Sequence, residues 1–575
     1  MAGCFSGATY AQDEVTPDWE TEVKAALEKG DLGAARVLAE RRLGDPSSTA
    51  AAHAFLGTID FRQQRYGEAA GHFQAAREAG AWGPDLLERW SESLQTQGRI
   101  SEAIQLLEDA LRRDPSFRAV RLRLADLYIS TGQLQNALPQ LEQVYDEGLR
   151  NVRVVLELAS ARFTVGKDYL AVDLLAPLTE STSSPNLLLQ IGKLYFRNLL
   201  YREAAAPLER AWSLGGPSYE AGMYLSLTYH QLERYADCAR ILNQIQPDAD
   251  KALEYHILRG SALARLERWS EAQDQLERAV ASSPDRADGY LNLGLFFMER
   301  GDRQKGWEML EKGSRRMVPG SKILYSLSTR QNCDGLIPPA VGKVKNAEKA
   351  VFYTNLAESF HKMHHWVSAL EIFLLALDED PELPEPYGGI GLICQELGSP
   401  EVGRAFLQQG IDLHPGAADL HFYLGTIYYA LGRHAEAIAS YQQALRLDGP
   451  SPPARHWLFL GIAQSGEGKE SQEQAKSSFL RAREIDPQLA LAHYELGKWY
   501  LKNGQPALAE SSLERALELD PQLLGAYYQA ALACLRNGKK DKGRALMEAF
   551  QKKRALRGQA ARPHSEKDYA APEGP

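Results

Sequence analysis

The chain has 575 residues, with 75 acidic and 65 basic side chains and a formal net charge of −10. A hydrophobic content of 44% and a charged content of 24% are close to the averages of folded proteins, which excludes wholesale disorder. The acidic excess disfavours nucleic acid as the main partner, because phosphate binding needs a concentrated positive field. No run of about 18 apolar residues predicts a transmembrane helix.

Residues 1–17 form a stub of small, uncharged residues that turns acidic at Asp13 and Glu14. The stub resembles the end of a bacterial secretory signal with cleavage after Ala11, or a lipoprotein box in which Cys4 carries lipid. Both interpretations need a basic region and an apolar region that the stub does not contain. We favour an extracytoplasmic location, periplasmic or lipid-anchored, if the true start lies upstream. The alternative is a cytoplasmic protein.

Small residues recur through residues 18–313 at a nearly fixed interval. Eight of them follow one another in steps of 34 or 33 residues: Gly57, Ser91, Ala125, Ala159, Gly192, Ser226, Gly260 and Gly294. A small residue lets two helices approach closely, so a fixed step indicates one packing unit that is repeated. Residues 18–313 are therefore predicted to form a first array of repeats.

Each repeat is predicted to contain two helices. A second small residue follows the first by 12 positions, as Ala69 follows Gly57 and Ala103 follows Ser91. Apolar side chains around these positions have the i, i+3, i+4 spacing of amphipathic helices. A glycine often stands between the two predicted helices, for example Gly132, where a helix end favours a left-handed residue.

Residues 314–347 interrupt the pattern. They contain Pro319, Pro338 and Pro339 and show little periodicity, which indicates a linker or a degenerate repeat. The small residues then resume from residue 348 to residue 556, in steps of 34 or 36 residues: Ala357, Gly391, Gly425, Gly461, Gly497 and Ala531. We expect a second array here, ending in a basic capping helix. Residues 557–575 mix Pro, Gly, Ala and charge, and are predicted to be disordered.

Two of these repeats resemble a known family closely. Ala418–Asp448 resembles the tetratricopeptide repeat of bacterial proteins, as does Leu491–Pro521. The matching residues in the first are Leu424, Gly425, Tyr428, Gly432, Ala437, Tyr441 and Ala444. The resemblance implies an all-α, right-handed superhelical solenoid of about 14–15 helix-turn-helix repeats, interrupted once.

The same resemblance implies a concave groove lined by the first helix of each repeat, in which a segment of a partner protein lies. The groove positions with aromatic or methionine side chains are Phe163, Phe196, Met223, Met298, Phe422, Tyr429, Tyr494 and Tyr528. Such side chains suit an apolar partner segment. The alternative for each of them is packing against a neighbouring helix.

No enzymatic motif is complete. In Gly461–Ser471 the second glycine is followed by Glu467 where a phosphate loop needs lysine. His361, His364 and His365 are close in sequence but have no nearby cysteine to complete a metal site. The five cysteines show no CxxC pair, so neither a zinc site nor a thioredoxin-like redox motif is expected. The pattern indicates no disulfide either, and we interpret Cys238, Cys394 and Cys534 as buried packing residues.

We therefore predict a non-enzymatic scaffold that binds other proteins or peptide segments, with no catalytic residue, cofactor or metal. The alternative is an accessory subunit of an envelope-assembly, secretion or glycosyltransferase system whose catalytic part is on another chain.

Overall fold

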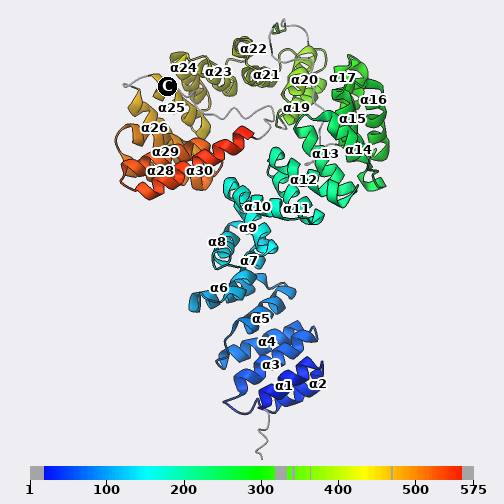
Figure 1. Cartoon of the computed structure of the whole chain (residues 1–575). Helices are drawn as coiled ribbons and strands as arrows, with labels where there is room; N and C mark the ends of the chain where they lie inside the picture. The colour runs from blue at the N-terminus through cyan, green and yellow to red at the C-terminus, as the bar shows by residue number, and fades with distance from the viewer. Residues whose placement is uncertain are drawn as a thin grey trace, which may run out of the picture. The chain divides into compact units, whose positions relative to one another are not determined.

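The computed structural model describes residues 18–316, 333, 335–339, 344–362, 364–467 and 471–559. The stub of residues 1–17, most of the irregular zone and most of the C-terminal tail therefore lie outside the described residues. The described part contains thirty α-helices and a single turn of 3-10 helix, η1 (Ala249–Lys251). Figure 1 shows the helices following one another in pairs. The predicted all-α fold of paired helices is confirmed.

The fifteen pairs each consist of a first and a second helix. The first helices are α1 (Trp19–Glu28), α3 (Thr49–Arg62), α5 (Pro84–Thr96), α7 (Arg118–Ser130), α9 (Val152–Thr164), α11 (Pro185–Arg197), α13 (Tyr219–Gln231), α15 (Ala252–Arg265), α17 (Ala287–Glu299), α19 (Ala347–Lys362), α21 (Pro384–Glu396), α23 (Ala418–Ala430), α25 (Ala454–Glu467), α27 (Ala490–Lys502) and α29 (Leu524–Arg536). The second helices are α2 (Leu32–Glu40), α4 (Tyr66–Glu78), α6 (Ile100–Arg113), α8 (Leu134–Asp146), α10 (Asp168–Ser181), α12 (Tyr201–Gly215), α14 (Tyr235–Leu242), α16 (Trp269–Ser282), α18 (Arg303–Ser314), α20 (Trp366–Glu379), α22 (Pro400–Leu413), α24 (His434–Leu447), α26 (Gln472–Ile485), α28 (Pro506–Leu519) and α30 (Lys540–Gln559).

The recurring small residues lie where the two helices of a pair touch. A Cβ carbon added to Gly192 would lie 2.5 Å from the Leu208 side chain, and one added to Gly497 would lie 2.4 Å from Leu513. Gly260 and Gly294 face Leu276 and Leu310 in the same way. The residue 16 positions after the small residue thus fills the space that the missing side chain leaves.

The chain divides into two compact units, one up to Leu174 and one from Leu175, so the division falls within α10. This division differs from the one predicted around residues 314–347, which stays a prediction. The largest apolar core lies in the second unit. It runs from Leu263 to Ile427 and includes Cys333, from the irregular zone. Cys333 therefore belongs to the core of the second unit, and Leu336 packs against that core.

The expected absence of disulfides was wrong. Cys394 is buried on α21, three residues after Gly391, as the repeat pattern predicts, but it is bonded to Cys333. The two residues are 61 positions apart, and no spacing motif marks such a pair in the sequence. Cys238 and Cys534 are buried free thiols, in agreement with their interpretation as packing residues.

Candidate partner-binding surface

Within each unit, successive first helices pack directly against one another. This holds for α1 to α7 in the first unit, and for α11 to α17 and α19 to α29 in the second. Successive second helices show no such close packing among the described elements. A stack of helix pairs is narrower on the side where successive helices approach each other. The first helices therefore lie on the narrower, inner side of each stack. We call their solvent-facing side the inner surface.

Polar side chains join neighbouring first helices along the inner surface. Arg123 on α7 donates to Ser91 Oγ at 3.2 Å and to Gln95 Oε1 at 2.6 Å, both on α5. In the second unit, Arg455 on α25 pairs with Asp419 on α23 at 2.9 Å. Arg455 and Asp419 are 50% and 62% exposed, so their charges remain available to a partner. The sequence motifs missed these links because each link joins two different repeats.

The eight predicted groove residues differ widely in exposure. Phe163, Met223 and Phe422 are buried, which leaves little of their side chains for a partner to touch. Four others are half-buried: Phe196, Met298, Tyr429 and Tyr494. The last one, Tyr528, is 39% exposed.

Three of these side chains have ring contacts with near neighbours. The Phe422 ring stacks on His456 with centroids 4.3 Å apart, which is a packing contact between α23 and α25. Phe196 lies edge-on to Tyr224, 5.6 Å away on the next first helix. Tyr528 on α29 lies 5.4 Å from Phe550 on α30. The first helices therefore contribute both aromatic contacts and polar links.

A histidine of the inner surface is held in its neutral form. His230 Nε2 lies 2.9 Å from Ser261 Oγ on the next first helix, and its ring packs against Tyr235. Burial, with a smaller effect of the positive Arg265, lowers the pKa of His230 to about 4. His230 therefore contributes a neutral polar link at physiological pH.

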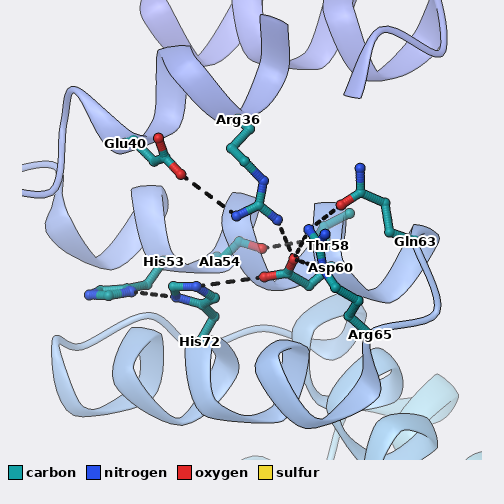
Figure 2. A network of polar contacts seen from close by, with 9 residues as sticks. All are labelled: Arg36, Glu40, His53, Ala54, Thr58, Asp60, Gln63, Arg65 and His72. Atoms are coloured by element: carbon teal, nitrogen blue, oxygen red, sulfur yellow. Dashed lines mark hydrogen bonds and ion pairs between the residues drawn. The ribbon is translucent and has the colours of Figure 1, made fainter. Parts of the chain in front are cut away.

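A second polar network, in the first unit, involves a buried carboxylate. Figure 2 shows Asp60 of α3 at its centre, contacted by Arg36 of α2 and by Arg65 just before α4. Arg65 Nε donates to Asp60 Oδ1 at 2.9 Å, and His72 Nε2 lies 3.6 Å from Oδ2. His72 in turn lies 3.0 Å from His53, measured between the two Nδ1 atoms.

At the centre of this network, Asp60 occupies a repeat position that is aromatic in several other repeats. Asp60 stands three residues after the small residue Gly57, where other repeats have Tyr128 or Tyr195. Its side chain is only 2% exposed and serves to tie α2, α3 and α4 together. With Arg36 and Arg65 both paired with Asp60, the carboxylate has a structural role.

The chemical motifs considered in the sequence have structural roles. His364 has a positive φ of 60° in the turn between α19 and α20, and its ring stacks on Trp366. His361 also packs against Trp366, so the histidines do not converge on a metal position. Gly461 lies inside α25 against Phe479, so Gly461–Glu467 is helical and cannot cradle a phosphate. Residues 468–470 lie outside the described residues.

One group in the described part of the chain has the composition of a metal site, Glu510, Glu514 and Cys534. Two lysines occupy it. Lys539 and Lys542 donate to Glu510 Oε1 at 2.8 and 3.1 Å, and Asn537 donates to Oε2 at 2.7 Å. Burial opposes ionisation of Glu510, yet these hydrogen bonds lower its pKa to about 2. The Glu510 carboxylate is thus paired with two lysines.

Comparison with known proteins identifies the repeats. Family models of the tetratricopeptide repeat match residues 21–84, 94–144, 257–305, 395–452 and 490–523. This chain is a tetratricopeptide-repeat protein. The matched segments lie in both compact units, in keeping with the helix pairs described above.

Two curated relatives share part of the length of this tetratricopeptide-repeat protein. Cellulose synthase operon protein C of Escherichia coli K12 is 25% identical over 276 residues, 45% of this chain and 22% of the relative. The TPR repeat-containing protein YpiA of Bacillus subtilis 168 is 21% identical over 260 residues, 45% of this chain and 61% of the relative. The chain thus spans less than two thirds of either relative.

Among solved structures, YrrB, a TPR protein with an unusual peptide-binding site, is similar at 21% identity and a TM-score of 0.27. The similarity covers 33% of this chain and 95% of YrrB. Within the described residues, no helix is both long and apolar enough to span a bilayer.

Proposed function

We propose that this tetratricopeptide-repeat chain is a non-enzymatic scaffold that binds segments of partner proteins along the inner surface of its first helices. The observation that carries the proposal is the direct packing of successive first helices in each unit. It lines up equivalent side chains from repeat to repeat, as a surface for an extended or helical segment requires.

The side chains on this surface define the kind of segment that fits. The first helices carry the half-buried aromatic groups Phe196, Tyr429 and Tyr494 and also exposed charges such as Asp419 and Arg455. The aromatic groups offer contact area, and the charges favour a partner with polar groups in matching positions. We therefore propose an amphipathic partner segment in place of the purely apolar one predicted from the sequence.

The absence of enzymatic activity is part of this proposal. Two buried carboxylates that could act as catalytic groups, Asp60 and Glu510, are instead paired with basic side chains. These ion pairs support a non-enzymatic role. The net charge of −10 further supports protein over nucleic acid as the partner.

A second candidate function is an accessory subunit of an envelope-assembly, secretion or glycosyltransferase system, with the catalytic part on another chain. The similarity over 276 residues to cellulose synthase operon protein C favours it. In this case the inner surface would bind other subunits of that system, and the scaffold role would be the same.

Photo-crosslinking tests the proposal directly. A benzophenone amino acid replaces Phe196, Tyr429 or Tyr494 on the inner surface of the full chain, in its native cells. The control positions are Leu214 and Leu508, each 53% exposed, on α12 and α28. We expect crosslinks to a defined set of proteins from the inner positions and not from the control positions. The same proteins crosslinked from both sets would contradict the proposal.

A further inference from the structure

The Cys333–Cys394 bond lies in a protected place. Both cysteines are fully buried, and their Cα atoms are 5.5 Å apart, within the usual range for a disulfide. Cys333 belongs to the same apolar core as Leu356 and Phe360 of α19, and Leu336 packs against that core. The bond therefore joins the irregular zone to α21 inside the second unit.

The chain around Cys333 is held by hydrogen bonds as well. The Cys333 amide donates to Ser399 Oγ at 3.2 Å, at the start of α22. Gln409 Nε2 on α22 donates to the Pro339 carbonyl at 2.6 Å. We call residues 333 and 335–339 the strap. Its partners, Cys394, Ser399 and Gln409, come from α21, α22 and the turn between them.

The strap carries a conspicuous surface residue. Ile337 is 81% exposed, while its neighbour Leu336 is half-buried against the core. A segment this short, with an exposed isoleucine, buries too little apolar surface to hold itself in place. A covalent bond at one end supplies the missing restraint.

The other two described cysteines have no such arrangement. Cys238 and Cys534 are buried and free, and burial raises the pKa of the Cys238 thiol to about 12. Pairing is therefore selective for the two cysteines that the fold brings together.

We propose that Cys333–Cys394 is a native structural disulfide, that it fixes the strap on α21 and α22, and that the protein works in an oxidising compartment. Disulfides persist in such compartments and are rare in the reducing cytosol. The inference stands apart from the proposed function, because it concerns where the chain folds and not what it binds.

The bond forms by thiol–disulfide exchange. One cysteine, as its thiolate, attacks a small-molecule or protein disulfide and releases one thiol from it. The second cysteine thiolate then attacks the mixed disulfide, forms the Cys333–Cys394 bond and releases the other thiol. The two cysteines lose two protons and two electrons in total, and the oxidant disulfide becomes two thiols.

Peptide mapping in native cells tests the compartment. Free thiols are blocked in the living organism with a membrane-permeant alkylating agent, and the full chain is then isolated, digested without reductant and analysed by mass spectrometry. We expect the linked Cys333–Cys394 peptide, with Cys238 and Cys534 unpaired, either alkylated or as thiols. Alkylated or reduced Cys333 and Cys394 in the bulk of the native protein would overturn the proposal.

Thermal unfolding tests the role of the bond in the strap. Reduction is expected to lower the unfolding midpoint of the oxidised full chain by about 5 °C. The C333S/C394S double variant should melt at that lower midpoint and be insensitive to reductant, while C238A, as the control, keeps the sensitivity. Limited proteolysis should cleave the strap near Gly335 only after reduction. A verified reduction that changes neither the midpoint nor the cleavage would show that the bond does not fix the strap.

Discussion

Gly57 on α3 lies directly against the ring of Phe73 on α4, so that a Cβ carbon at Gly57 would be 2.7 Å from that ring. The pair shows why the recurring small residues matter. The ring of Phe73 fills the space that a side chain at Gly57 would occupy. This close packing holds the two helices together. Gly425 and Tyr441 form the same kind of pair in the second unit, again at 2.7 Å.

We predict that Gly57→Ala destabilises the first repeats by about 1–3 kcal/mol, because the added methyl group overpacks the ring of Phe73. The matched control is Gly71→Ala on α4, where an added Cβ meets nothing within 4 Å. That change should stabilise the helix by about 0.5–1 kcal/mol. Hydrogen exchange of the α3 and α4 amides measures both effects, and equal protection in the two variants would refute the packing argument.

The buried Asp60 network gives a second prediction. Asp60→Asn removes the charge that Arg36 and Arg65 share, and should cost about 2–3 kcal/mol in the local stability of α2 to α4. Glu102→Gln is the control, because the Arg99–Glu102 pair is exposed at 45% and 57% and should contribute little to stability. Similar losses of amide protection in both variants would mean that burial of Asp60 has no special importance.

The repeat architecture was predictable because it depends on local pattern. The small residues, the apolar spacing and turn glycines such as Gly132 predicted two helices in each of about 14–15 repeats, and the described part of the chain contains fifteen helix pairs. Each of these signals acts within about 34 residues, so the sequence carries it directly.

The functional surface was only partly predictable. Exposure depends on how one repeat packs on the next, and the repeat pattern does not distinguish the buried Phe422 from the half-buried Tyr429. The Arg123–Ser91 link and the Cys333–Cys394 bond join residues from different repeats, and no spacing rule connects them. The sequence did contain a signal for the Asp60 network, because a charged residue stands at position 60 where other repeats have an aromatic one. The predictions made from the sequence did not include this network.

Acidification should weaken the second unit through His230. Its pKa in the folded chain is about 4, whereas the unfolded chain binds the proton near pH 6.5. The unfolded state therefore takes up a proton first, and the stability present above pH 6.5 is lost as the pH falls from 6.5 towards 4.

The His230→Asn variant keeps a polar side chain beside Ser261 but does not titrate. We expect its stability to fall by about 1–2 kcal/mol less than that of the wild type between pH 7 and pH 4.5. Urea unfolding at several pH values measures the difference. Parallel pH profiles for wild type and variant would show that His230 does not titrate in this range.

Turn residues with positive φ offer a gain in stability. Glu233 has a φ of 59° in the turn between α13 and α14, where Gly132 has 73° in the turn between α7 and α8. Glu233→Gly should relieve backbone strain and stabilise the second unit by about 0.5–1 kcal/mol. Gly132→Ala, the reverse change, should destabilise the first unit by about 1 kcal/mol, because alanine is strained at a positive φ. Thermal unfolding midpoints of the two variants, compared with the wild type, test both expectations. A lower midpoint for Glu233→Gly would contradict the assignment of backbone strain to Glu233.

The central claim is that partners bind the inner surface of the first helices. Its most direct measurement is quantitative affinity purification from native cells, with the full chain carrying Phe196→Ser, Tyr429→Ser, Tyr494→Ser and Tyr528→Ser together. The control chain carries Leu214→Ser and Leu508→Ser on the second helices, and circular dichroism confirms that both chains keep wild-type helicity. We predict that the first chain loses its specific partners by at least about tenfold while the control retains them. Full retention of those partners by the correctly folded inner-surface variant would contradict the account.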